Sequence, residues 1–181
     1  MTLLKHLILM LALASGPTEA ALDLGETAPD FTASAALGGE VFEFSLQQAL
    51  RKGPVVLYFF PASFSEGCSL EAHNFAQAID QFKALGATVV GVSRDEIDAQ
   101  KRFSVSACRG KFAVAADPEQ KIMKAYDAVL TLRPEYANRV TYLIAPNSTV
   151  AYQYTSLNPD KHVQKTLAAL REWAANKPQS R

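Results

Sequence analysis

The feature that most constrains the fold is an unbroken apolar run followed by a cysteine-bearing segment with helical periodicity. Residues 54–60 (Pro-Val-Val-Leu-Tyr-Phe-Phe) are all apolar, which is typical of a strand buried on both faces. The residues that follow Cys68 show the spacing of one helical face: Ala72, Phe75, Ile79 and Phe82. The sequence therefore places Cys68 where a buried strand turns into the first turn of a helix.

The start of a helix is a position where a thiol becomes nucleophilic. Unpaired backbone N–H groups and the positive end of the helix dipole favour an anion there, and for cysteine that anion is the reactive thiolate. Ser65 precedes Cys68 by three residues, and Arg139 begins another apolar segment. A buried arginine is costly unless it faces an anion, so Arg139 is expected to meet a carboxylate or a thiolate. Cys68 as an inert buried thiol and Arg139 in a purely structural ion pair are the alternatives.

The rest of the chain alternates between strand and helix patterns. The chain is predicted to begin with a hairpin of 28–32 and 41–44 around Gly38–Gly39, followed by a helix over 45–51 capped by Ser45. Further strands are predicted over 87–92, 112–116, 139–144 and 150–154. Further helices are predicted over 95–108, from Asp117–Pro118–Glu119 with Asp117 as the cap, and after 158–160. This order predicts an α/β three-layer sandwich with a mixed central sheet and an N-terminal hairpin.

Length and charge narrow the class of protein. The chain has 181 residues, the size of one domain with a substantial core. Its 18 basic side chains balance 18 acidic ones, and no basic cluster stands out. A nucleic-acid partner is therefore not expected, because such partners are met by concentrated positive charge.

The first twenty residues differ in composition from the rest of the chain. Lys5 and His6 precede a short apolar run over 7–14, and small residues allow cleavage after Ala14 or Ala20. This pattern predicts a secretory signal peptide over 1–20, with an uncleaved membrane anchor as the alternative. The mature domain would then cover 21–181 and work outside the cytosol, in a periplasm or an equivalent exported location, where two cysteines can pair.

A short motif around the cysteine carries a family resemblance. Pro61, Ser65 and Cys68 follow the pattern Pro-x-x-x-Ser/Thr-x-x-Cys, which resembles the active-site signature of peroxiredoxins. The likeness runs from about Gly25 to the last helix. It also includes these segments: Ala-Pro-Asp-Phe at 28–31, Glu71, Asp-Pro at 117–118 and Arg-Val-Thr-Tyr at 139–142. Among these AhpC/TSA-like proteins, the chain most resembles the peroxiredoxin Q, or bacterioferritin comigratory protein, subgroup.

The resemblance implies a thioredoxin-like fold and a thiol-dependent peroxidase that needs no cofactor, neither metal nor haem. Cys68 would be the peroxidatic cysteine, which attacks a peroxide oxygen and becomes a sulfenic acid. Ser65 and Arg139 would hold the peroxide oxygens, and Pro61 would shield the sulfenic acid. Glu71 would act as a structural partner, for an arginine among other possibilities. Implied partners are a peroxide substrate and a thiol or dithiol electron donor, such as a thioredoxin-like protein, and the expected state is a monomer or weak dimer.

The second cysteine is the main departure from the subgroup. Its members often carry a cysteine five residues after the first, where this chain has His73. Some relatives instead resemble this chain in having the resolving cysteine in the helix predicted over 95–108, where Cys108 lies. The resemblance then implies a Cys68–Cys108 disulfide formed after the first turn of the Cys68 helix frays. The alternative is an idle Cys108 in a one-cysteine enzyme that an external thiol resolves.

Two other classes of function compete with a peroxidase. An exported thioredoxin-fold copper chaperone would need two closely spaced cysteines and a histidine, and a metal site from Cys68, His73 and His162 lacks recognisable ligand spacing. A non-catalytic domain would use a Cys68–Cys108 disulfide only as a staple. A dithiol oxidoreductase is excluded because the chain has no Cys-x-x-Cys.

Overall fold

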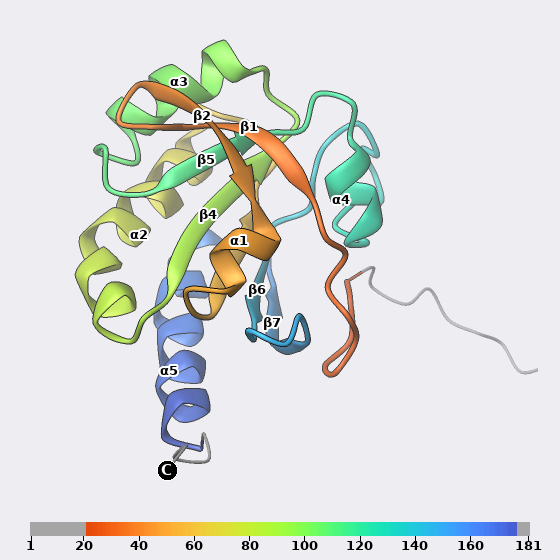
Figure 1. Cartoon of the computed structure of the whole chain (residues 1–181). Helices are drawn as coiled ribbons and strands as arrows, with labels where there is room; N and C mark the ends of the chain where they lie inside the picture. Colours follow the sequence, from red (N-terminus) through yellow and green to blue (C-terminus); the bar gives the residue numbers. More distant parts are fainter. Residues whose placement is uncertain (1–20, 177–181) are drawn as a thin grey trace, which may run out of the picture.

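The computed structural model describes residues 21–176, whose centre is a seven-stranded mixed sheet (Figure 1). The strands are β1 (Thr32–Leu37), β2 (Glu40–Ser45), β3 (Val55–Phe59), β4 (Thr88–Ser93), β5 (Ala113–Ala116), β6 (Val140–Ile144) and β7 (Val150–Thr155). The helices are α1 (Leu46–Leu50), α2 (Glu66–Ala84), α3 (Ile97–Ser106), α4 (Lys121–Ala125) and α5 (His162–Ala175), with a 3-10 turn over Pro159–Lys161. The strands lie in the order β2-β1-β5-β4-β3-β6-β7.

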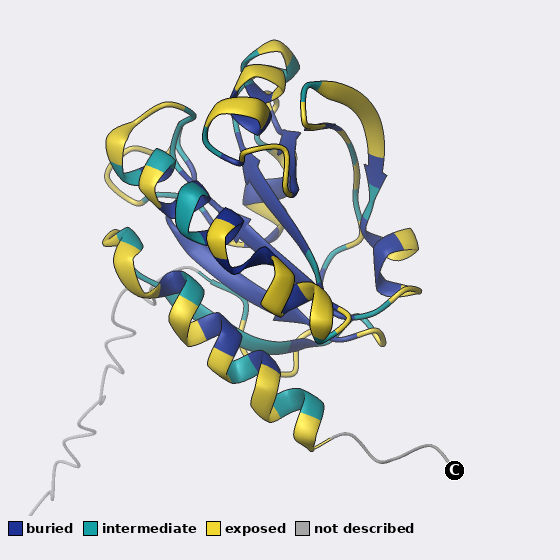
Figure 2. Cartoon of the chain, turned by 90° about the vertical axis from the view of Figure 1, so that its left-hand side faces the viewer, coloured by how far each residue is buried: buried dark blue, intermediate teal, exposed yellow. Residues whose placement is uncertain are grey.

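The apolar run at 54–60 forms the middle of the sheet, as predicted. All five residues of β3 are buried, and the strand pairs in parallel with β4 and antiparallel with β6. Its alternate side chains enter two different cores. Val55, Leu57 and Phe59 pack on the face covered by α1 and α4, whereas Tyr58 and its neighbours of the same parity face α2, α3 and α5. Figure 2 shows the buried strands between helices whose outer surfaces are exposed. The predicted thioredoxin-like α/β sandwich with a mixed sheet is confirmed.

The N-terminal hairpin is present, and its first strand begins later than predicted. β1 and β2 pair around Gly38 and Gly39, which both have positive φ angles, 58° and 89°. The segment 28–31 does not join the hairpin, because the Ala28 N–H donates to the Ser148 carbonyl instead. The predicted cap of the following helix is confirmed, since the Ser45 hydroxyl accepts from the Gln48 N–H at 3.3 Å.

Two predicted helix boundaries are wrong for local reasons. The helix predicted to open at Asp117–Pro118 begins only at Lys121, after Gln120 adopts a left-handed φ of 59°. The Asp117 carboxylate still serves that helix, because it accepts from the Met123 N–H at 2.9 Å. The helix predicted over 95–108 spans only α3, from Ile97 to Ser106, and the chain then turns towards β5 through Arg109 and Gly110, which both have positive φ.

The prediction of a signal peptide concerns residues 1–20, which lie outside the described residues. Within residues 21–176, no helix is both long and apolar enough to cross a membrane.

Candidate active site

Cys68 lies in the first turn of α2, directly after the loop that leaves β3, as the sequence predicts. Its side chain is buried, with 1% of its surface exposed. Ser65 is the N-cap of the helix, and its hydroxyl accepts from the Cys68 N–H at 3.4 Å. The same hydroxyl donates to the carbonyl of Ala62 at 3.2 Å. Ser65 therefore fixes the turn that holds the thiol, while a contact of its hydroxyl with peroxide stays a prediction.

The guanidinium of Arg139 is the cation closest to the thiol in the described contacts. Its Nη2 lies 3.4 Å from Cys68 Sγ, its Nη1 forms an ion pair with Glu71, and its Nε donates to the Leu157 carbonyl at 3.0 Å. Arg139 and Glu71 are both buried. Glu71 follows Cys68 by three residues and so shares its side of the helix. The expectation that Arg139 meets an anion, with Glu71 as its structural partner, is confirmed.

Gly67 allows this close approach. A Cβ atom at Gly67 would lie 3.3 Å from Arg139 Nη2, which is tighter than an ordinary contact. A side chain at this position would therefore press on the guanidinium that faces Cys68. The small residue before the cysteine is thus part of the geometry that brings thiol and cation together.

Burial and pairing set the charges of the ion pair. Burial raises the pKa of Glu71 to about 7, and the Arg139 guanidinium works against that rise. For Arg139, burial favours the neutral form, but Glu71 and Cys68 outweigh it and raise its pKa further. Arg139 consequently stays cationic and provides a fixed positive charge beside the sulfur.

His162 is a member of this cluster that the sequence did not identify. It begins α5, far along the chain, yet its Nδ1 lies 3.5 Å from Glu71 Oε1. Its Nε2–H donates to the Ser156 carbonyl at 2.8 Å, and its Nδ1 accepts from the Thr141 hydroxyl at 2.8 Å. Only the pairing of β6 with β7 and the return of α5 bring this ring to the site. No local sequence signal could have revealed it.

His162 is expected to stay neutral well below physiological pH. Burial lowers its pKa to about 4 from an ordinary value of 6.5. The folded state then resists a proton that the unfolded state takes up below pH 6.5, so stability falls as the pH drops from 6.5 towards 4. NMR titration of the His162 ring should show the neutral Nε2–H form at pH 5.5. A midpoint near 6.5 would contradict this environment.

A polar network anchors the loop between β3 and α2 to the start of α3. The Ser63 N–H donates to Asp95 Oδ2 at 2.7 Å, and the Ser63 hydroxyl donates to Gln100 Oε1 at 3.2 Å. The buried amide of Gln100 in turn donates to Ser93 Oγ at 2.7 Å and to the Ala115 carbonyl at 3.1 Å. These residues were missed from the sequence, because a serine, an aspartate and a glutamine in unrelated segments carry no motif.

Pro61 and Phe64 shape the same loop. Pro61 is half-buried where the chain leaves β3. Phe64 has a left-handed φ of 67° and packs edge-on against Phe103 of α3, with ring centroids 5.3 Å apart. The loop is thus tied to α3 by an aromatic contact as well as by hydrogen bonds. The shielding role of Pro61 stays a prediction.

Cys108 lies two residues beyond the end of α3, in the turn that leads to β5. It is fully buried, and burial raises the pKa of its thiol. Both cysteines are free and belong to the same apolar cluster on one face of the sheet. Tyr58 is a neighbour of both cysteines. Burial is the main cause that raises the pKa of its hydroxyl, and electrostatic interaction with Cys108, Glu71 and Cys68 raises it further. That hydroxyl is buried and has no hydrogen-bond partner in the described part of the chain.

His73 and His162, the histidines among the described residues, do not assemble a metal site with Cys68. His73 pairs with Gln77 at 3.0 Å, and both ring nitrogens of His162 are already engaged. Within residues 21–176, no group of three His, Cys, Asp or Glu side chains is arranged to hold a metal ion.

The sheet and the buried cysteine at a helix N-terminus together define a thioredoxin-like thiol protein. The chain belongs to the AhpC/TSA family of peroxiredoxins, whose family model matches residues 24–153. It is 33% identical over 147 residues to a protein named chloroplastic peroxiredoxin Q from Oryza sativa subsp. japonica, covering 81% of this chain. A chloroplastic peroxiredoxin Q from Sedum lineare is also 33% identical over 147 residues, covering 81% of this chain and 76% of that protein.

The fraction of each relative's length that this chain matches differs from one relative to the next. The chain spans 65% of the length of the Oryza sativa protein. Among solved structures, the peroxidoxin BcpB from Mycobacterium tuberculosis matches with a TM-score of 0.74 at 27% identity. That match covers 86% of this chain and 98% of the other. The resemblance to the peroxiredoxin Q subgroup, drawn from a few motifs, is therefore confirmed.

Proposed function

We propose that the protein is a thiol peroxidase that reduces hydrogen peroxide and organic hydroperoxides through Cys68. The observation that carries the proposal is the 3.4 Å contact between Arg139 Nη2 and Cys68 Sγ at the N-terminus of α2. The guanidinium and the helix N-terminus both favour a thiolate over a thiol. Membership of the peroxiredoxin family supports the same chemistry.

In the first step, the Cys68 thiolate attacks one oxygen of the peroxide. The new S–O bond forms as the O–O bond breaks, and the second oxygen leaves as water or an alcohol after taking up a proton. Negative charge moves from sulfur to the leaving oxygen. The guanidinium of Arg139 can stabilise the negative charge on both the sulfur and the leaving oxygen, because Glu71 and the Leu157 carbonyl bind its other N–H groups and fix its position.

In the second step, Cys108 resolves the sulfenic acid. Its sulfur attacks Cys68 Sγ, the S–OH bond breaks, and water leaves as the disulfide forms. Because Cys68 faces Arg139 inside a helical turn, that first turn must open before the two sulfurs meet. The location of Cys108 in a turn outside α3, in the same apolar cluster, supports this route.

A thiol or dithiol donor then reduces the disulfide and completes the cycle. The predicted signal peptide supports an exported compartment such as a periplasm as the place of the reaction, with a thioredoxin-like protein as the proposed donor. The proposed cycle uses Cys68 and Cys108 together with the side chains that surround Cys68. A monomer or weak dimer is the assembly that we expect.

The test is a stopped-flow reaction of the reduced protein with hydrogen peroxide, followed by mass spectrometry. We expect rapid loss of one thiol and then a Cys68–Cys108 crosslinked peptide after one equivalent of peroxide. The variant Cys108→Ser should keep the fast first step but accumulate sulfenic or sulfinic Cys68. If the wild-type protein accumulates these acids while Cys108 stays reduced, an external thiol resolves the enzyme. If the reduced protein does not react, the peroxidase assignment is wrong.

A further inference from the structure

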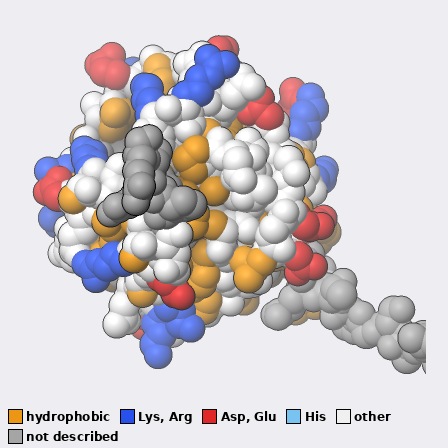
Figure 3. All heavy atoms as spheres, turned by 60° about the horizontal axis from the view of Figure 1, so that its bottom comes forward, with side chains coloured by type: hydrophobic (Ala, Val, Ile, Leu, Met, Phe, Trp, Pro, Cys, Tyr) orange, Lys and Arg blue, Asp and Glu red, His pale blue; other side chains and the backbone are white. Residues whose placement is uncertain are grey.

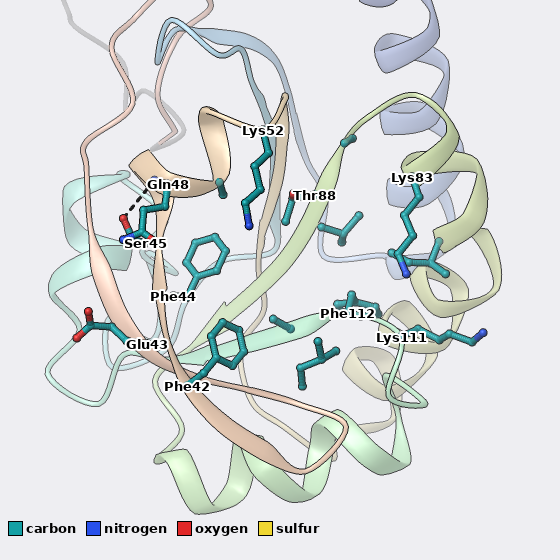
Figure 4. A pocket seen from close by; sticks show the side chains of 16 residues that line it. Phe42, Glu43, Phe44, Ser45, Gln48, Lys52, Lys83, Thr88, Lys111 and Phe112 are labelled. Carbon is teal, nitrogen blue, oxygen red and sulfur yellow. Dashed lines mark hydrogen bonds between the residues drawn. The ribbon is translucent and has the colours of Figure 1, made fainter.

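A cavity of about 410 Å³ lies at the end of the sheet remote from Cys68 (Figure 4). It is lined by β2, α1, the last turns of α2 and the starts of β4 and β5. Lys83, on its wall, follows Cys68 on α2 by 83 − 68 = 15 residues, which is about 22 Å along a helix. The cavity is therefore separate from the thiol site, and its volume is typical of a small-molecule pocket.

The cavity exists because the sheet has a gap at this end. β4 begins at Thr88, but β5 pairs with it only from Val90 opposite Ala113. β1 reaches β5 through just two residue pairs, and α1 is only five residues long. β3 pairs with the first residues of β4, but on the other side of β4 no strand lies beside Thr88 and Val89. Side chains of β2, α1 and α2 line the cavity at this gap.

The walls of the cavity combine apolar side chains, three of them aromatic rings, with polar ones. Phe42 and Phe44 alternate along β2 and present their rings on the same side, and Phe112 lies on the opposite wall (Figure 4). Phe42 is 40% exposed, so part of this wall meets solvent. Figure 3, which views the molecule from its lower end, shows hydrophobic atoms exposed in the middle of the face and charged side chains around its edge.

Three lysines, Lys52, Lys83 and Lys111, line the cavity, and none of them is paired with a carboxylate among the described residues. Lys52 and Lys83 lie on opposite sides of the opening, whereas Lys111 points away from it (Figure 4). The single acidic lining residue, Glu43, is directed outwards on the far side of β2.

We propose that the cavity binds a single-chain fatty acid. The alkyl chain would lie in the cavity against the exposed ring of Phe42, with the buried rings of Phe44 and Phe112 beside it, and it would cover the exposed surface of Phe42. The carboxylate would lie between the ammonium groups of Lys52 and Lys83. A neutral lipid would leave these cations unmatched, and a small polar anion would leave the aromatic walls unfilled. The combination of an apolar wall and unpaired cations therefore favours an amphipathic monoanion.

Decanoate at concentrations below its micelle threshold is the probe. Titration followed by amide NMR should give saturable one-site binding, with the largest shifts at Phe42, Thr88 and Phe112. The double variant Lys52→Ala/Lys83→Ala should bind decanoate about tenfold more weakly, the scale of two partly exposed ion pairs. Phe42→Ala should weaken binding of both decanoate and decanol, whereas decanol should not respond to the lysine changes.

Lys101→Ala/Lys124→Ala is the matched control, because it removes two exposed lysines that do not line the cavity. It should bind decanoate as the wild type does. Equal affinity for decanol and decanoate, shifts centred elsewhere, or no saturable binding would each overturn the proposal. Because the readout is binding and not turnover, a negative result leaves the assignment of Cys68 untouched.

Discussion

Replacing Cys68 with serine is expected to abolish peroxide reduction and leave the fold intact. Serine is close in size to cysteine, so the buried position remains filled, but its hydroxyl supplies no thiolate to attack the peroxide. The rate of peroxide loss should fall by roughly a thousandfold or more, to that of a protein without a nucleophile. Stopped-flow measurement of peroxide consumption, with circular dichroism of both proteins, provides the readout.

The reciprocal variant Cys108→Ser is the control for this loss. It removes a thiol of the same apolar cluster but keeps Cys68, so its first turnover should remain fast. Activity near the wild-type level in Cys68→Ser would refute Cys68 as the nucleophile. Loss of the first turnover in both variants would point to a requirement for the two thiols together.

Replacing Arg139 with alanine should slow the reaction of Cys68 with peroxide by at least about tenfold, the scale of losing a charged donor in the transition state. It should also destabilise the fold by about 3 to 5 kcal/mol, because Glu71 would remain buried without its partner. The second-order rate constant and the free energy of unfolding in urea measure the two effects separately.

A double variant separates catalysis from stability. Arg139→Ala/Glu71→Gln removes the carboxyl group that would otherwise be buried without its partner or have to take up a proton, so part of the lost stability should return while the peroxide step stays slow. Arg133→Ala is the matched control, since that arginine is exposed and its side chain contacts nearby Glu135 and Tyr136 and not the Cys68 site. A double variant that regains the wild-type rate would make Arg139 purely structural.

The parts of the site that the sequence predicted depend on neighbours along the chain. The continuous apolar run at 54–60 and the helical spacing after it were sufficient to place Cys68 at a helix start. The cost of burying an unpaired arginine was sufficient to require an anion near Arg139, and Glu71 supplies it. In each case the decisive interaction is either local or set by a general rule about charge.

The parts that the sequence did not predict depend on how distant segments meet. His162 reaches Glu71 only because β7 and α5 fold back on β6. The contact between Ser63 and Asp95 forms because the loops that follow β3 and β4 lie at the same end of the sheet. The ends of the helices near Gln120 and Arg109 depend on left-handed residues that are not glycine. Such residues give no reliable signal in a single sequence.

The anchoring of Arg139 has a consequence for recovery after each turnover. Two of its three contacts, to Glu71 and to the Leu157 carbonyl, do not involve the thiol. If Cys68 leaves its helical turn to form the proposed disulfide, these two contacts would hold the guanidinium in its rotamer, so the conformational entropy of ordering a long side chain would not be lost again in every cycle. The returning sulfur meets a cation already in place. Return to the reactive state would then require only that the first turn of α2 forms again. The rate of this step should be that of local helix formation and not that of a rearrangement of the core.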